Sequence, residues 1–87
     1  MAVSILQQNE VHASAISLGT QPNDTSVLDL FVAQANVASP VGCATSWSKI
    51  ATSPDQWRGV GPFTGTNVTL VAGRTPPQVD ATLLEIG

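Results

Sequence analysis

The sequence predicts an all-β domain, a small antiparallel β-sandwich or jelly-roll-like barrel of about five to seven strands. Apolar and polar residues alternate in the last third of the chain, over residues 65–73 and 79–87. A period of two places one face of a strand against a core and the other toward water. Gly73 and two prolines interrupt this pattern, so we expect two strands joined by a tight connection. Turn-forming residues separate further short apolar runs along the chain.

The chain of 87 residues makes one domain, in which residues 11–87 form the predicted sandwich. Residues 1–10 begin apolar and end polar. They suit either an N-terminal arm that lies on a neighbouring subunit or the first edge strand, and the pattern leaves both open. In an arm, Val3, Ile5 and Leu6 would be the anchors.

Between Val11 and Leu18 the alternation changes phase after Ala15. Such a change indicates either a β-bulge or a strand that switches faces. The next residues, 19–26, concentrate turn formers and are predicted to be a loop.

The type of residues 27–37 is open from the pattern alone. In a helix, Ser26 could act as the cap; in a strand, Leu28, Leu30 and Val32 would share one face. We favour the strand, because the segment is rich in β-branched residues and strands are predicted on either side.

Further along, residues 38–42 break the chain, residues 43–51 are predicted to be a strand that carries Trp47, and residues 52–56 form a turn. The run 59–65 is rich in Gly and Pro, so it fits an edge strand or a loop better than a central strand.

The charge pattern excludes several classes of partner. About 10% of residues are charged and the net charge is −3, with Lys49, Arg58 and Arg74 scattered along the chain. No basic patch is available for phosphates, so we expect no nucleic acid. The first six residues are too short for a membrane span or a signal segment, so we expect no membrane. Hydroxyl and amide side chains can be buried against protein without stranding charges, which indicates a chain that works in an assembly, although an extracellular β-domain could have the same composition.

No motif for catalysis or metal binding is present. His12, the single histidine, lies in an alternating segment where it would face solvent, and no nucleophile elbow accompanies it. Nothing in the sequence pairs two of the six acidic residues. Cys43 is the single cysteine, which we expect to be a small buried hydrophobe. We therefore predict a non-enzymatic protein with no cofactor and no metal.

Trp57 and Arg58 follow the turn at residues 52–56. An exposed tryptophan could stack on a sugar, as in a carbohydrate-binding module. Alternatively, Trp47 fills the core and Trp57 covers one end of the sandwich or meets a neighbouring subunit, where Arg58 could make a bidentate pair. We favour the core or interface interpretation for Trp57.

From Ser14 onward, the order of segments resembles a small β-sandwich that recurs in tailed-phage virion proteins, among them capsid decoration, collar and fibre-tip domains. The resemblance is one of strand order and turn placement over about five-sixths of the chain. The matching features are residues 15–18, 26–32 and 46–50, the Gly-Pro-Phe run 61–63, and residues 68–73 and 79–86. The first strand of that pattern is shortened or replaced by residues 1–10, and the resemblance carries no catalytic residue.

The resemblance implies a structural protein of the virion, assembled in the host cytoplasm. We expect a capsid decoration (cement) protein that binds the major capsid protein or other virion proteins as a homo-oligomer, with a trimer favoured. The expected interface residues are Val3, Ile5, Leu6, Trp57 and Arg58. The alternatives are a carbohydrate- or receptor-binding β-sandwich module such as a fibre tip, and an enzyme whose site the sequence does not reveal.

Overall fold

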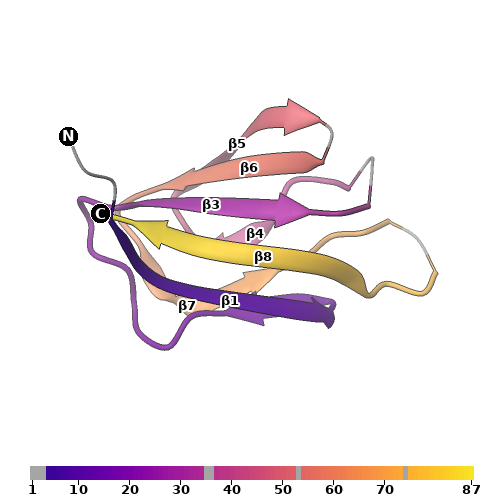
Figure 1. Cartoon of the computed structure of the whole chain (residues 1–87), viewed down its shortest axis with the longest axis horizontal. Coiled ribbons are helices and arrows are strands. Elements are labelled where there is room, and N and C mark those ends of the chain that lie inside the picture. Colours follow the sequence, from indigo (N-terminus) through magenta and orange to yellow (C-terminus); the bar gives the residue numbers. More distant parts are fainter. Residues whose placement is uncertain (1–3, 35–36, 53, 74) are drawn as a thin grey trace.

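The computed structural model of the chain confirms the all-β prediction (Figure 1). It describes residues 4–34, 37–52, 54–73 and 75–87. Within these residues there are eight strands and no helix, one strand more than the upper end of the predicted range. The strands are β1 (Ile5–Ala13), β2 (Ala15–Ser17), β3 (Val27–Val32), β4 (Val41–Cys43), β5 (Ser46–Thr52), β6 (Asp55–Val60), β7 (Thr64–Thr69) and β8 (Val79–Ile86).

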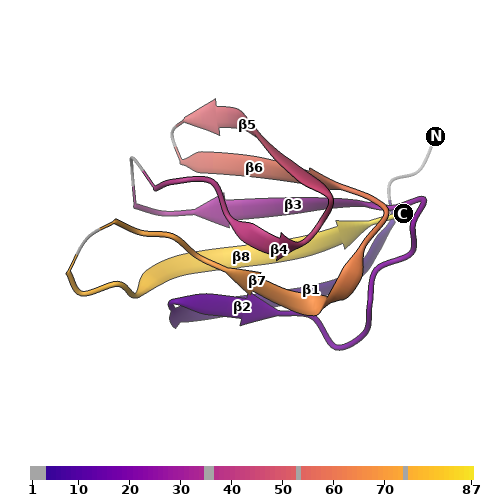
Figure 2. The ribbon, with the colours of Figure 1, turned by 180° about the vertical axis from the view of Figure 1, so that it is seen from behind.

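The strands form two antiparallel sheets that pack face to face. The large sheet has the order β1-β8-β3-β6-β5 and the small sheet has the order β2-β7-β4. Figure 1 shows the large sheet in front, and Figure 2 shows the small sheet from behind. The structure is consistent with the predicted small β-sandwich.

The core lies between the sheets and follows the predicted alternation. In β3, Leu28, Leu30 and Val32 are almost completely buried, and the small sheet contributes Ile16 and Val68 from the other side. Alternate positions of β8 complete this layer with Val79, Ala81 and Leu83. The period of two was therefore a correct guide to which residues face inward.

The strand predicted over residues 27–37 is shorter than expected. β3 ends at Val32, and the chain bends at Ala33 and Gln34, while residues 35 and 36 lie outside the described residues. The Gln34 side chain bonds to the backbone and side chain of Asp80, which replaces strand pairing at this point.

The phase change near Ala15 marks a strand that changes sheets. β1 ends at Ala13 in the large sheet, Ser14 bends, and β2 begins at Ala15 in the small sheet. The backbone oxygen of Ser14 accepts a hydrogen bond from the Leu70 amide at 2.9 Å. Of the two alternatives, the change of face is the one that occurs.

The described part of residues 1–10 is built into the large sheet. β1 pairs with β8 without a break at residue 10, and the Ser4 oxygen accepts a hydrogen bond from the Gly87 amide at 2.9 Å. It is therefore an edge strand, which was one of the two predicted roles, while Val3 lies outside the described residues.

For the Gly- and Pro-rich run 59–65, the expectation of an edge strand or a loop holds only at residues 61–63, which connect β6 and β7, and is wrong for the rest. Gly59 lies in β6, between β3 and β5, and β7 is the central strand of the small sheet. The Trp47 side chain fills the space above Gly59, because a Cβ at Gly59 would lie 2.8 Å from Trp47 Cζ3. A neighbouring aromatic ring thus supplies the packing that glycine lacks.

Two other segments are divided differently from the prediction. Residues 43–51 were expected to be one strand, but Cys43 ends β4 in the small sheet and β5 starts at Ser46 in the large sheet. β7 and β8 also belong to different sheets, so residues 70–78 connect the two layers and do not close a hairpin. The predicted turn at residues 52–56 is narrower, because β5 includes Thr52 and β6 begins at Asp55.

A buried carboxylate joins β1, the loop before β3, and β8. Glu85 is 3% exposed and accepts hydrogen bonds from Gln7 Nε2 at 2.8 Å, the Asn23 amide at 2.9 Å and Ser26 Oγ at 2.7 Å. Burial acts to raise the pKa of Glu85 and is the largest single cause, but the three hydrogen bonds together outweigh it and hold the pKa below its usual range.

Replacing Ser26 by alanine is expected to lower the free energy of unfolding by about 1–3 kcal/mol at neutral pH, because a buried charged acceptor loses a donor. The folded state lowers the pKa of Glu85, so this stabilisation is present above the unfolded pKa and is lost as pH falls through the folded pKa. Denaturant unfolding of Ser26→Ala should thus differ from wild type at neutral pH and converge with it in acid. Ser48→Ala, at an exposed strand position, is the control, and a Ser26→Ala difference that persists in acid would contradict the account.

Candidate functional site

The outward face of the large sheet carries a row of apolar side chains across four strands. Residues paired across antiparallel strands share a face. The register places Ile5 of β1 opposite Ile86 of β8, Ile86 opposite Val27 of β3, and Val27 opposite Val60 of β6. These four residues, Ile5, Ile86, Val27 and Val60, are called the apolar row.

The two ends of the apolar row are open to solvent. Ile5 is 56% exposed and Val60 is 40% exposed, while the two central residues are half-buried. Leu6 lies beside the row and packs against Gly87, where an added Cβ would lie 2.9 Å from Leu6 Cδ1. Single exposed apolar residues are ordinary, but neighbouring ones on one face are typical of protein contact surfaces.

Next to the apolar row, an ion pair neutralises the centre of the face. Arg58 Nε donates to Asp29 Oδ1 at 2.9 Å and Nη2 donates to Oδ2 at 3.2 Å. Hydrogen bonding to Asp29 raises the pKa of Arg58, and the attraction of the two charges adds to this effect. Arg58 thus makes its bidentate pair within its own chain. A partner that covers this face would meet a charge that is already paired, which reduces the cost of desolvation.

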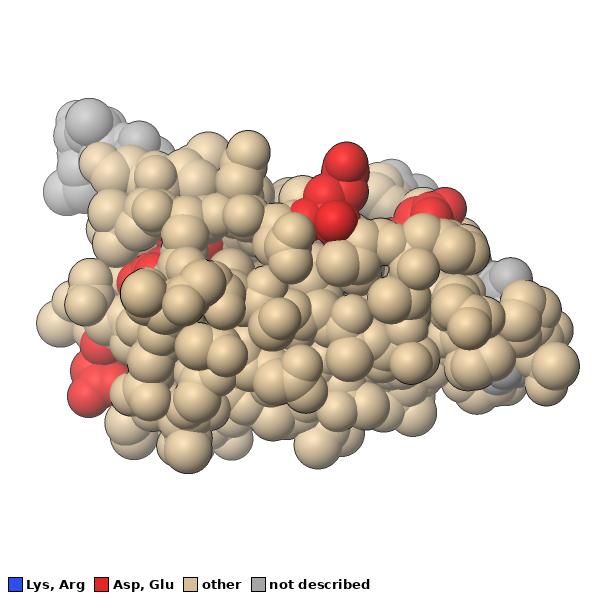
Figure 3. Space-filling view, turned by 90° about the horizontal axis from the view of Figure 1, so that it is seen from below, with Lys and Arg blue, Asp and Glu red and all other residues tan. Residues whose placement is uncertain are grey.

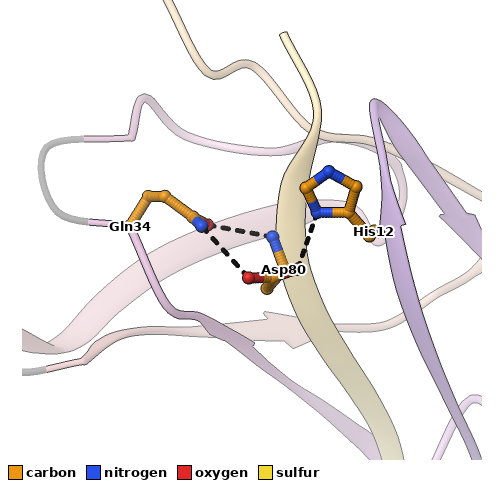
Figure 4. A network of polar contacts seen from close by, with 3 residues as sticks. All are labelled: His12, Gln34 and Asp80. Carbon is orange, nitrogen blue, oxygen red and sulfur yellow. Dashed lines mark hydrogen bonds and ion pairs between the residues drawn. The ribbon is translucent and has the colours of Figure 1, made fainter. Parts of the chain in front are cut away.

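The other end of the same face is polar (Figure 4). His12 Nδ1 lies 2.7 Å from Asp80 Oδ1, and Gln34 Nε2 donates to Asp80 Oδ2 at 3.3 Å. The Asp80 amide in turn donates to Gln34 Oε1 at 2.9 Å. His12 and Asp80 line a shallow groove of about 520 Å³ whose lining also includes Glu10 and Phe31.

The His12–Asp80 pair orients an imidazole, which is one part of an acid–base site. The two side chains are 67% and 59% exposed, so water screens the pair. Among the described residues, no hydroxyl or thiol forms a hydrogen bond with His12. The predicted solvent-facing position of His12 is confirmed, and the geometry supplies orientation without a nucleophile.

The predicted interface residues lie in different parts of the structure, some on the surface and one in the core. Ile5 belongs to the apolar row and Leu6 lies beside it, and for these two the interface role stays a prediction. Trp57 is 9% exposed and belongs to the core, so its ring offers no platform for a sugar or a neighbouring subunit. Of the alternatives for this residue, the core is the one that occurs.

Trp47 and Cys43 were also predicted to be core residues. Trp47 is half-buried against the core, with Nε1 donating to the Gly42 oxygen at 3.0 Å. Cys43 is buried as expected, and burial, with a smaller contribution from Glu85, raises the pKa of its thiol. A raised pKa disfavours the reactive thiolate.

Val27, Val60 and Ile86 were not predicted from the sequence as contact residues. Val27 and Ile86 occupy positions where the alternation predicts an outward side chain, and an apolar residue at such a position was the available signal. Val60 lies in the run 59–65, for which no alternation was predicted. The pairing of β1, β8, β3 and β6 decides which outward residues are neighbours. The alternation within a single strand carries no information about this pairing.

Replacing His12 by alanine is expected to raise the pKa of Asp80 toward its usual value. The hydrogen bond from His12 is the largest cause of the lowered pKa of Asp80, followed by that from Gln34. An NMR titration of the side-chain carboxyl carbon would measure the shift. Gln8→Ala, an outward residue of the same strand, is the control, and an Asp80 pKa that ignores His12→Ala would show that the pair does not form in solution.

In the part of the chain that the structure describes, no three His, Cys, Asp or Glu residues are grouped so that they could hold a metal ion. The same residues include no helix long and apolar enough to cross a bilayer. Comparisons with protein-family models, curated proteins and solved structures found no match.

Proposed function

We propose that this protein is a non-enzymatic structural protein that binds other protein subunits through the outward face of its large sheet. The observation that carries the proposal is the apolar row, with Ile5 and Val60 exposed at its ends. Burying such side chains against a partner removes apolar surface from water, which is the main favourable term in protein association.

The surroundings of the apolar row fit a protein interface. The row would form its apolar part, the Asp29–Arg58 pair would be covered as a pair that is already neutral, and the polar residues beyond it would form the rim. The row crosses three strand spacings of about 5 Å each, so it is about 15 Å long. A single row of side chains of this length offers less area than the roughly 600–1,000 Å² that a stable interface buries on each partner. A partner must therefore cover most of the sheet face, or several copies must bind together.

Within this class we propose a capsid decoration protein of a virus particle, which binds capsid subunits as a homo-oligomer. Its support is the resemblance in strand order and turn placement to virion β-sandwiches, together with the low content of charged residues, 10%. Sugar binding through Trp57, the alternative function, loses its support because that ring is buried.

Replacing Val60 by glutamate is expected to weaken binding to the capsid at least about tenfold, because an unpaired carboxylate would be buried at the interface. Ile50→Glu is the matched control, since Ile50 is also exposed but lies outside the apolar row. Both variants should keep the β-sheet circular dichroism spectrum. Co-sedimentation with capsids assembled from the major capsid protein of the encoding virus would measure binding.

Three outcomes would count against the proposal. If folded Val60→Glu binds like wild type, the apolar row is not the contact surface. If Ile50→Glu loses as much affinity, the effect is one of net charge. If the wild-type protein does not bind capsids at all, the narrower proposal of a decoration protein fails.

A further inference from the structure

The two edges of the large sheet are protected to different degrees. β5 carries Lys49, and its register with β6 shifts between Lys49 and Ala51. Lysine residues and bulges are devices that keep edge strands from pairing with other chains. β1 has an irregular register only between Ile5 and Gln7, and from Gln7 to Ala13 it is regular and contains neither lysine nor proline.

The direction of the free backbone groups of β1 follows from the pairing of β8. The Asp80 oxygen accepts a hydrogen bond from the Ala33 amide at 3.0 Å, and the Asp80 amide donates to Gln34, so both groups of Asp80 point toward the β3 side. Backbone groups alternate in direction along a strand, and those of the next residue of β8 therefore point toward β1 and pair with Val11. It follows that Glu10 and His12 point their backbone groups to the free edge. At this edge the Glu10 amide donates to Asn9 Oδ1 of its own chain at 2.8 Å, an exposed local bond that a partner strand would replace.

The second half of β1 is the more open part of this edge. Gln7 Oε1 accepts hydrogen bonds from the amides of Gly19 and Thr20, which holds the loop after β2 against the first half of the strand. In Figures 1 and 2 this loop extends beyond β1 at the end where the chain termini lie. On the side of the molecule shown in Figure 3, the described residues present acidic side chains and no Lys or Arg.

We propose that two copies of this chain pair through β1, antiparallel about a two-fold axis at Val11. In this register Glu10 lies opposite the partner's His12, and His12 lies opposite the partner's Glu10. Each of these two pairs would exchange two backbone hydrogen bonds across the free edge. The contact is therefore a β-sheet addition in which the partner strand is a second copy of β1.

The charges of the strand select this register. No ion pair joins the Glu10 carboxylate to another described residue. His12 Nδ1 bonds to Asp80, and in the imidazolium form the Nε2–H group can donate to the partner's Glu10. An axis at Glu10 would place two carboxylates opposite each other, which is destabilising. An axis at Asn9 would oppose Glu10 with the partner's Gln8 and gain no charge pairing.

Such a dimer would enlarge the binding surface. The two-fold axis is perpendicular to the sheet, so two five-stranded sheets become one of ten strands with both apolar rows on the same face. The dimer deepens the proposed function. The pairing through β1 stands by itself, and only the identity of the partner that binds the enlarged face rests on the proposed function. The contact closes at two copies, so it replaces the trimer favoured from the sequence.

A charge exchange between two variants tests the pairing. Glu10→Lys opposes the introduced lysine with the partner's His12, and His12→Glu opposes the introduced glutamate with the partner's Glu10. Each variant alone should dimerise at least about tenfold more weakly than wild type in sedimentation equilibrium, and an equimolar mixture should recover the wild-type constant within about threefold. Recovery also shows that both variants fold. Weakening without recovery, or no weakening, would overturn the proposal.

Cysteine cross-linking tests the register in a Cys43→Ala background. Val11→Cys should form a disulfide-linked dimer under mild oxidation, because opposed residues of a non-hydrogen-bonded pair have Cα atoms about 4.5 Å apart, within disulfide reach. Asn9→Cys should remain monomeric on a non-reducing gel. Cross-linking of Asn9→Cys in place of Val11→Cys would overturn the register, and cross-linking of neither would overturn the dimer. If the dimer fails while Val60→Glu still abolishes capsid binding, only this inference is lost.

Discussion

The structure depends on β8, which lies between β1 and β3 and pairs with both along nearly its whole length. Successive side chains of a strand point to opposite faces, so a slip of one residue in either pairing would exchange the inward and outward sets. Val79, Ala81 and Leu83 face the core, and Asp80 and Ile86 face outward. The register of this one strand therefore sets the core, the polar network with His12, and the apolar row together.

The buried carboxylates show a second constraint, because a charge that is removed from water needs partners. Glu85 accepts three hydrogen bonds, and Asp29 forms an ion pair with Arg58. Asp55 is almost fully buried at the start of β6, where the Val37 amide donates at 3.3 Å and Lys49 Nζ lies 3.2 Å away. Each carboxylate joins segments that are distant in the chain, so these groups link strands that hydrophobic packing alone would leave less specified.

The two surfaces that we connect with function arise from the same sheet. The apolar row occupies one end of the outward face, and Glu10 and His12 lie toward the other end on the edge strand β1. Both surfaces stay outside the core, so a change at either can alter association while the packing between the sheets is kept. This separation makes face binding and edge pairing independently measurable.

The alternation of apolar and polar residues was sufficient to predict the all-β class, the burial of Leu28, Leu30 and Val32, and the outward position of His12, because a period of two is a local property of the chain. It also located the change near Ala15. The assignment of strands to sheets was not accessible in this way: β7 and β8 have similar patterns but lie in different layers.

The candidate site was predicted only at Ile5 and Leu6. Trp57 and Arg58 were placed at an interface because they follow a turn, yet β6 lies inside the sheet, where one side chain enters the core and the other reaches Asp29. Composition and periodicity thus establish that strands form and which face of each is apolar. The neighbours of each outward residue come from cross-strand register, which pairs residues as distant in the chain as Ile5 and Ile86 and is therefore a property of the folded molecule.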